Sequence, residues 1–374
     1  MKKTLCFFIV LVIFCSSFSV SALGTSAKAA ILINGDTGEV IFEQNADEQL
    51  SMASTTKIMT ALLLCEYGNF EKEITVTAEM LRVEGSSMGL LPGDKVTLHD
   101  LLYGMMLASG NDAANVTAYV LGGTVDGFVK MMNQKAEELG LKNTHFETPS
   151  GLDGEEHYTT ARDLAELSRY AMKNKAFSEA AGSKSAVLSY GNPPYKRTLT
   201  NHNRLLKSFE GAVGVKTGFT KKSGRCLVSA AKRDGKFVIA VTLRDPDDWA
   251  DHSALLEYGL NKVKLTEILP PKESYDIDII GGNEKNLKIS VEPITFSSLS
   301  DEDIECSVNL PKFIYAPVSA DEVIGNVLYK KGETEIKKVP ILSGKEIPAA
   351  EQKKDFISAF KENFKYIFLN LWEK

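Results

Sequence analysis

Three short groups of residues in this sequence combine side chains that could together cleave an amide bond. The first is Ser54 with Lys57, at the start of an apolar run that extends to Leu64. A serine and a lysine three positions apart lie on the same face of a helix. If burial lowers the lysine pKa, its neutral amine can take the hydroxyl proton as the oxygen attacks a carbonyl. The pair therefore predicts a nucleophile and its general base.

The tetrapeptide alone does not define a site, because Ser-x-x-Lys also occurs at 229–232 and 358–361. Motifs this short often match by chance. A helix-capping serine followed by a solvated lysine would give the same pattern. The pair at Ser54 differs from the other two because it begins an apolar helix and has polar partners later in the chain.

The second group, Ser109-Gly110-Asn111, separates two segments that we expect to be helices, 97–107 and 112–121. A tight turn there would present a hydroxyl and an amide in a fixed geometry, although all three are also ordinary turn residues. The third group, Lys216-Thr217-Gly218, lies in a segment expected to be a strand at or beside a sheet edge. It offers a fixed positive charge, a hydroxyl donor and close backbone approach.

Taken together and in this order, the three groups resemble the motifs of penicillin-binding proteins and β-lactamases. Their flanking residues resemble, more specifically, the low-molecular-mass penicillin-binding proteins, which are D-alanyl-D-alanine carboxypeptidases of the peptidase S11 type. The resemblance extends from about residue 28 to the C-terminus. It rests on Ala53-Ser54-Thr55-Thr56-Lys57, Leu107-Ala108-Ser109-Gly110-Asn111-Asp112-Ala113-Ala114, Gly151-Leu152, Thr160-Ala161-Arg162-Asp163 and Gly214-Val215-Lys216-Thr217-Gly218-Phe219-Thr220.

This resemblance implies both a fold and an activity. The fold would be an α/β (α+β) catalytic domain, like that of serine β-lactamases and transpeptidases, with a small C-terminal all-β domain and an amphipathic helix. The activity would be removal of the terminal D-alanine from peptidoglycan stem pentapeptides through an acyl-enzyme on Ser54. The family also binds β-lactam antibiotics such as penicillin. Lys57 would be the general base, and Ser109 would relay protons.

The resemblance also implies the substrate-binding residues. Asn111 would hold the substrate amide, while Lys216 and Thr217 would receive the terminal carboxylate or steer protons near Ser109. The backbone N–H groups of Ser54 and of Phe219, which follows Gly218, would form the oxyanion hole. Relatives often carry histidine at position 219, so phenylalanine there could alter substrate or drug preference without disturbing a backbone donor.

The two ends of the chain predict export and attachment to a membrane surface. Residues 1–22 have the layout of a secretory signal peptide, with basic Lys2 and Lys3, an apolar run and a small-residue end at Val20-Ser21-Ala22. The alternative is an uncleaved anchor, but the apolar run is shorter than the about 20 residues that a span requires. We expect a peripheral protein on the extracytoplasmic face of a bacterial cell membrane.

We expect the catalytic domain to occupy residues 23–268, a small β-rich domain residues 269–350, and an amphipathic helix residues 351–374. Apolar and polar residues alternate in short runs across the second of these regions, as they do in strands. In the last region one helical arc is apolar and lysines flank it, which suits a helix lying in the membrane interface. The alternative is a helix packed on its own β domain. The apolar residues are Phe356, Ile357, Phe360, Phe364, Ile367, Phe368 and Leu371.

Composition narrows the function further. The net charge of −6 argues against nucleic acid as a partner. The histidines and cysteines show no metal-ligand spacing and no disulfide framework, so we predict no metal and no cofactor. The competing functions are a β-lactamase, disfavoured by the β domain and the terminal helix, and a penicillin-binding sensor without turnover, disfavoured by the intact motifs. Endopeptidase action on cross-links would use the same site, and the sequence does not separate it from carboxypeptidase action.

Overall fold

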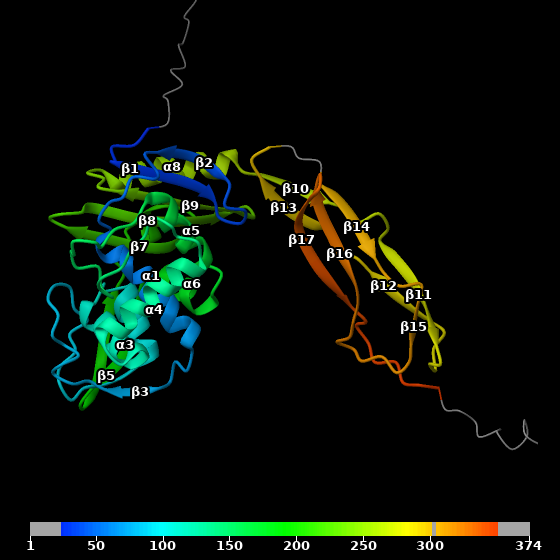
Figure 1. Ribbon diagram of the computed structural model, residues 1–374, viewed down its shortest axis with the longest axis horizontal. Coiled ribbons are helices and arrows are strands. Elements are labelled where there is room, and N and C mark those ends of the chain that lie inside the picture. The colour runs from blue at the N-terminus through cyan, green and yellow to red at the C-terminus, as the bar shows by residue number, and fades with distance from the viewer. Residues whose placement is uncertain (1–23, 301–303, 351–374) are drawn as a thin grey trace, which may run out of the picture. The chain divides into compact units, whose positions relative to one another are not determined.

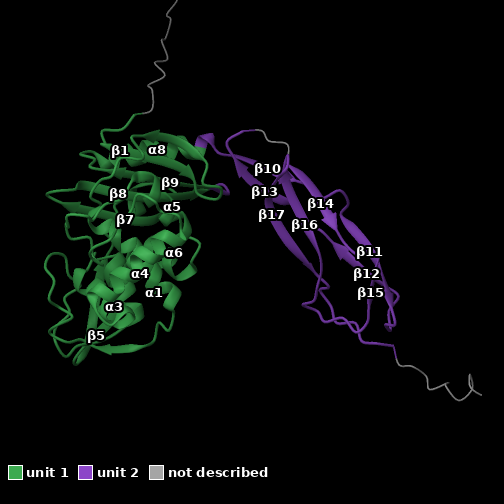
Figure 2. Cartoon of the chain, viewed as in Figure 1, with its two compact units in different colours: residues 1–233, 237–260 green, residues 234–236, 261–374 purple. Residues whose placement is uncertain are grey.

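The structure is a computed structural model that describes residues 24–300 and 304–350 (Figure 1). The chain divides into two compact units (Figure 2): the first contains residues 1–233 and 237–260, and the second contains residues 234–236 and 261–374. The predicted signal peptide and the predicted C-terminal helix lie outside the described residues. No helix in the described part of the chain is long and apolar enough to cross a membrane.

The first unit is built on an antiparallel five-stranded sheet with the order β2-β1-β9-β8-β7. Strand β1 is buried along its whole length because helices cover both of its faces. Ile31 and Ile33 belong to the core under the helices, whereas Leu32 faces Gly259 of α8 on the other side. The strands and this helix are β1 Ala29–Asn34, β2 Val40–Gln44, β7 Ala212–Thr220, β8 Gly224–Arg233, β9 Lys236–Leu243 and α8 Asp248–Lys262.

A cluster of helices packs below this sheet (Figure 1), and a second sheet of four strands, with the order β3-β4-β5-β6, completes the unit. Thr97 closes a capping box at the start of α2, and Thr160 caps α5. The remaining elements of the unit are η1 Ala53–Thr56, α1 Lys57–Tyr67, β3 Glu73–Thr75, β4 Lys95–Thr97, α2 Leu98–Met106, α3 Asn111–Gly122, α4 Val125–Glu138, α5 Ala161–Ala171, α6 Lys175–Gly182, β5 Ser185–Gly191, β6 Pro194–Thr200 and α7 Leu205–Ser208.

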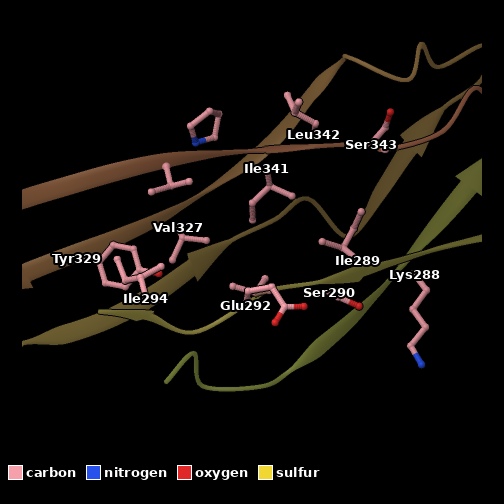
Figure 3. A pocket seen from close by; sticks show the side chains of 14 residues that line it. Lys288, Ile289, Ser290, Glu292, Ile294, Val327, Tyr329, Ile341, Leu342 and Ser343 are labelled. Carbon is pink, nitrogen blue, oxygen red and sulfur yellow. The ribbon is translucent and has the colours of Figure 1, made fainter. Parts of the chain in front are cut away.

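The second unit is made of strands, which confirms the prediction of an all-β region after an α+β catalytic one. Its strands pair as β10-β13, β12-β11-β15 and β14-β16-β17 around a separate apolar core. Side chains of β12, β16 and β17 line a groove of about 420 Å³ (Figure 3). The strands are β10 Lys264–Ile268, β11 Ser274–Ile280, β12 Asn286–Ser290, β13 Ile294–Ser298, β14 Glu305–Asn309, β15 Phe313–Tyr315, β16 Val323–Lys331 and β17 Thr334–Leu342.

Candidate active site

Ser54 lies in a single 3-10 turn, η1, immediately before α1, and not in the α-helix that the sequence predicts from this residue onward. Ala53 adopts a left-handed backbone conformation with φ of 47°, so the regular α-helix begins only at Lys57. Side chains at i and i+3 of a 3-10 turn eclipse one another. The tighter turn therefore brings the Lys57 amine within 3.0 Å of Ser54 Oγ. Neither η1 nor α1 has a side-chain cap, so Ser54 is not a capping serine.

The amine of Lys57 is fully buried and is held by two carbonyl oxygens besides the Ser54 hydroxyl. It donates to Asn111 Oδ1 at 2.7 Å and to the Ser150 backbone oxygen at 2.6 Å. A neutral amine has two N–H donors and one lone pair. Because both carbonyl oxygens can only accept, they use the two N–H groups and leave the lone pair for the Ser54 hydroxyl. The geometry is that of a base ready to take the serine proton.

Burial shifts the protonation balance of this amine toward its neutral form. Desolvation lowers the pKa of Lys57 well below the ordinary value for lysine, and the nearby charge of Lys216 lowers it further. Asp112 acts in the opposite direction but is the smallest of the three influences. A lowered pKa favours the use of this amine as a base.

The second group forms the tight turn between α2 and α3 that the sequence predicts. Ser109 has a left-handed backbone with φ of 56°, a strained conformation that is common at functional sites. The amide of Asn111 has only one possible orientation, since its Nδ2 donates to the Glu84 backbone oxygen at 2.6 Å. Its Oδ1 must then face Lys57. In this structure both polar ends of the Asn111 side chain are therefore engaged within the protein.

Lys216 lies on β7, which is an edge strand of the five-stranded sheet. Its side chain is 1% exposed and donates to Ser109 Oγ at 3.0 Å. Burial lowers the pKa of Lys216 to about 7. The Ser109 hydroxyl is therefore next to a second amine that can gain or lose a proton near neutral pH, whereas Thr217 is only half-buried and lines the open cleft.

Gly218 allows β7 to pass directly against the nucleophile turn. A Cβ at this position would lie 3.1 Å from the backbone nitrogens of both Ser54 and Thr55. The next residue, Phe219, is 65% exposed and its ring lies outside the core. The absence of a side chain at 218 thus keeps the Ser54 backbone N–H close to the strand that carries Phe219.

A loop from residue 147 to residue 157 supplies the Ser150 carbonyl and is fastened to η1 and α1. His157 Nδ1 accepts from the Glu147 backbone N–H at 3.0 Å, so Nε2 carries the proton and donates to Thr56 Oγ1 at 2.7 Å. Desolvation lowers the pKa of His157 to about 4, which keeps the ring neutral. Gly151 has φ of 88°, and a Cβ there would lie 1.9 Å from the Ala53 oxygen. The loop can therefore approach the turn only with glycine at this position.

The cleft in front of these residues has a volume of about 530 Å³. Ser54, Ser109 and Thr217 line it, and its far wall carries Arg225 and Trp249. Arg225 Nη2 donates to both carboxylate oxygens of Asp248, at 2.7 and 2.9 Å, and the guanidinium lies over the Trp249 ring. The sequence gives no indication of this wall, because its residues come from β8 and α8 without a recognisable spacing.

The structure brings all three predicted groups to one cleft and leaves one alternative pair elsewhere. Ser229 is buried and forms a hydrogen bond with His252. It does not line the cleft. The copy at 358–361 lies outside the described residues. Sequence reasoning missed the backbone oxygens of Glu84 and Ser150 and the anchoring role of His157. The only indication of them is the pair Ser150-Gly151, because a glycine in a polar loop marks close backbone approach.

Solved structures with a similar fold define the class. The chain superposes on the DD-transpeptidase of Streptomyces K15 with a TM-score of 0.62 and 34% identity, covering 65% of this chain and 100% of that one. It superposes on the D-alanyl-D-alanine carboxypeptidase DacD of Francisella tularensis with a TM-score of 0.63 and 28% identity, covering 87% and 95%. The fold is therefore that of the serine DD-peptidases and transpeptidases.

Sequence comparison gives the family. The protein-family model described as D-alanyl-D-alanine carboxypeptidase matches residues 16–247. A second family model, described as the C-terminal domain of penicillin-binding protein 5, matches residues 266–349. The chain is 31% identical to the D-alanyl-D-alanine carboxypeptidase DacF of Bacillus subtilis over 88% of both chains. It is 29% identical to DacC of Escherichia coli over 88% of this chain and 86% of that one.

The chain belongs to the D-alanyl-D-alanine carboxypeptidase family, as its sequence motifs predict. It is a serine-type carboxypeptidase and hence a hydrolase of the cell wall. The family acts on peptidoglycan peptides and binds β-lactams, which accords with an extracytoplasmic location.

Proposed function

We propose that Ser54 is the nucleophile of this carboxypeptidase and that Lys57 is its general base. The observation that carries this proposal is the Lys57 amine, buried and with both N–H groups given to the oxygens of Asn111 and Ser150. Its lone pair takes the Ser54 proton while Oγ bonds to the carbonyl carbon of the penultimate residue. The developing oxyanion is stabilised by the backbone N–H groups of Ser54 and Phe219.

Breakdown of this tetrahedral intermediate requires a proton for the departing amine of D-alanine. Ser109, hydrogen-bonded to Lys216, supplies that proton and is reprotonated by Lys216. The proton that Lys57 took from Ser54 then passes to Lys216, so both amines return to their starting states. The C–N bond breaks, D-alanine leaves, and the rest of the peptide remains as an ester on Ser54. Water attacks the ester carbonyl while Lys57, neutral again, takes one of its protons. The bond from the carbonyl carbon to Ser54 Oγ then breaks, and that proton passes to Oγ, which restores the serine hydroxyl and completes hydrolysis.

The remaining site residues divide between positioning and binding. Asn111 orients the Lys57 amine, and a substrate amide would share its side chain. Because Lys216 is buried, we assign it to proton steering, whereas Thr217 at the cleft surface receives the terminal carboxylate. Gly218 provides the close approach of β7 to the nucleophile turn.

The same proposal covers how the enzyme reaches its substrate. Residues 1–22 direct export, residues 23–268 form the catalytic domain, and residues 269–350 form a spacer. Residues 351–374 lie as an amphipathic helix in the outer face of the cell membrane. Deleting residues 351–374 should release the exported protein from membranes with its activity unchanged. A truncated protein that still sediments with membranes would show that the helix is not the anchor.

The choice among carboxypeptidase, endopeptidase, β-lactamase and sensor activity can be tested in one experiment on residues 23–374. Fluorescent penicillin should label the protein, and the label should be lost only slowly. The peptide diacetyl-lysyl-D-alanyl-D-alanine should release D-alanine. Rapid loss of label without D-alanine release would indicate a β-lactamase instead. Stable label without release would leave a sensor or an endopeptidase, and a cross-linked dimer of stem peptides would separate these two.

A further inference from the structure

An apolar patch is exposed where β11 and β15 end in the second unit. Ile280, Phe313 and Tyr315 are 43%, 46% and 67% exposed. The two strands are parallel, with Ile280 opposite Tyr315 and Asp278 opposite Phe313. Because alternate residues of a strand share one face, the three apolar side chains lie together on the outer face. The rings of Phe313 and Tyr315 also contact each other edge to face.

This patch is not part of the core of the second unit. The intervening residues Ile279 and Ile314 point inward, where Ile279 is buried and Ile314 packs against the core cluster. The inner face of these strands is therefore already packed against the core of the unit. Two adjoining aromatic rings and an isoleucine on the opposite face are typical of a surface that contacts something else.

The described chain ends beside this patch. The backbone N–H of Ala350 donates to the oxygen of Gly281, the residue after Ile280, at 2.8 Å. Ala349 forms a bridge with Gly282 on the same turn. Figure 1 shows the end of the described chain at the β11 and β15 end of this unit. Residues 351–374 therefore continue from a point one residue away from the patch.

We propose that Ile280, Phe313 and Tyr315 form a membrane-contact surface that enters the lipid interface beside the C-terminal segment. This inference rests on the proposed attachment of residues 351–374 to the membrane. Aromatic rings with a polar group favour the interface between headgroups and acyl chains. The exposed cations Lys285 and Lys312 adjoin these strands and suit anionic headgroups.

The depth of the contact is limited by its neighbours. Asp278 is exposed and lies opposite Phe313, so the patch enters only as far as the headgroup region. On its own so small a surface binds weakly. Joined to an anchoring helix, it meets the membrane at high effective concentration and adds a second point of attachment. Two points of attachment restrict how the second unit tilts on the membrane.

The test uses residues 23–374 and vesicles of phosphatidylglycerol and phosphatidylethanolamine. Replacing Ile280, Phe313 and Tyr315 with serine should weaken vesicle partitioning about tenfold, in line with the apolar area removed. The matched control replaces Val323, Ile336 and Leu342 with serine; these side chains are 62%, 39% and 45% exposed on the same unit. We expect that control to partition within about twofold of the parent, on the same area argument. Urea unfolding followed by circular dichroism verifies that the β-strand unit is folded in both variants, and D-alanine release from a soluble peptide verifies the same for the catalytic unit.

A direct probe of contact is Tyr315→Trp in a chain that also carries Trp372→Phe, with the Trp372→Phe chain as reference because Trp249 remains in both. Relative to that reference, bromine-labelled lipids should quench the indole introduced at 315, whereas an indole introduced at Val323 should not be quenched. Triple-serine partitioning equal to that of the parent would overturn the membrane-contact surface. If the triple-serine variant bound like the parent and deleting residues 351–374 abolished binding, the anchor proposal would hold and the membrane-contact surface would not. A parent chain that does not bind vesicles would overturn both.

Two other occupants of the patch would also overturn the proposal. If the parent sediments as a dimer without lipid and the triple-serine variant as a monomer, the patch joins two copies of this chain. If deleting residues 351–374 increases acrylamide quenching at position 315 without lipid, the patch is covered by the chain's own C-terminal segment.

Discussion

The cleft beside Ser54 and the groove of the second unit are similar in volume, about 530 and 420 Å³, but very different in what surrounds them. Lys57 and Lys216 are buried at the cleft, whereas the groove is lined mainly by aliphatic side chains, such as Ile289 and Ile341, and its lysine, Lys288, is exposed (Figure 3). Burying an amine lowers folding stability and shifts its pKa. The comparison shows that desolvated amines, and not the size of a hollow, distinguish a reactive site.

The backbone differs between the two regions in the same way. The left-handed residues Ala53 and Ser109 flank the cleft, and both are non-glycine residues. Strain of this kind lowers the free energy of unfolding and persists only where the surrounding contacts enforce it. Here those contacts hold a hydroxyl against an amine on each side of the cleft. None of the non-glycine residues that line the groove has a left-handed backbone.

The largest expected effect comes from removing one buried amine. Lys57→Met keeps the length of the side chain but deletes the lone pair that takes the Ser54 proton. Acylation by penicillin should slow by about 10²–10⁴-fold, the range for loss of a general base. Lys288→Met, at the groove, is the matched control and should acylate at the parent rate. Near-parent acylation of Lys57→Met would show that another group is the base.

The second effect is a displacement of the pH profile. Acylation should fall on the acid side as Lys57 becomes protonated. The positive charge of Lys216 lowers the pKa of Lys57, so Lys216→Met should allow that pKa to rise. The acid limb of the acylation rate should then move to higher pH, measured with fluorescent penicillin. An acid limb that stays in place, or moves to lower pH, would contradict the coupling between the two amines.

The third effect is on stability and comes from the loop that carries Ser150. Burial lowers the pKa of His157 from 6.5 to about 4. Between these values the unfolded chain binds more protons, so the free energy of unfolding falls as the pH falls through this window. The contribution of His157 is at most about 3 kcal/mol. In urea unfolding, the free energy of unfolding of His157→Gln should therefore depend less steeply on pH than that of the parent. His252, whose pKa burial lowers to about 3, is present in both proteins and contributes equally to both.

The same variant tests the function of the loop. Gln can replace only part of the connection between Thr56 and Glu147, so the Ser150 oxygen should be held less firmly against Lys57. We expect acylation to slow about tenfold, a typical cost of a displaced supporting contact. Thr56→Val breaks the same connection from the other side, and the double variant should be no slower than the slower single one. Fully additive losses would show that the two residues act separately.

The smallest effect on activity should come from the groove. Ile289→Ala should destabilise the protein by about 2–5 kcal/mol, as for other buried aliphatic side chains. The rate of D-alanine release per folded molecule should stay at the parent value. A change in kcat/KM with this variant would give the groove a part in catalysis that its lining does not suggest.

The sequence predicts more of the fold than of the site. Amphipathic spacing is a local property, so the helices expected at 97–107 and 112–121 are found as α2 and α3 within about one residue of those bounds. The edge position of β7 confirms the expectation that Lys216 lies at or beside a sheet edge. These elements depend on residues near one another in the chain.

The partners of Lys57 could not be predicted in the same way. The oxygens of Ser150 and Glu84 belong to the backbone, which every residue has, and they reach the site from loops far away in sequence. The 3-10 turn at Ser54 likewise depends on the left-handed backbone of Ala53, which alanine rarely adopts. Such features arise from tertiary packing, which short-range patterns do not record.

The most direct test of the account is to identify the residue that forms the acyl-enzyme. The protein would be trapped with benzylpenicillin, digested and analysed by mass spectrometry, in parallel with Ser54→Ala. We predict one penicilloyl group, on the peptide that contains Ser54, and no adduct on the alanine variant. An adduct on any other serine, or an alanine variant that is still acylated, would contradict the assignment of Ser54 as the nucleophile.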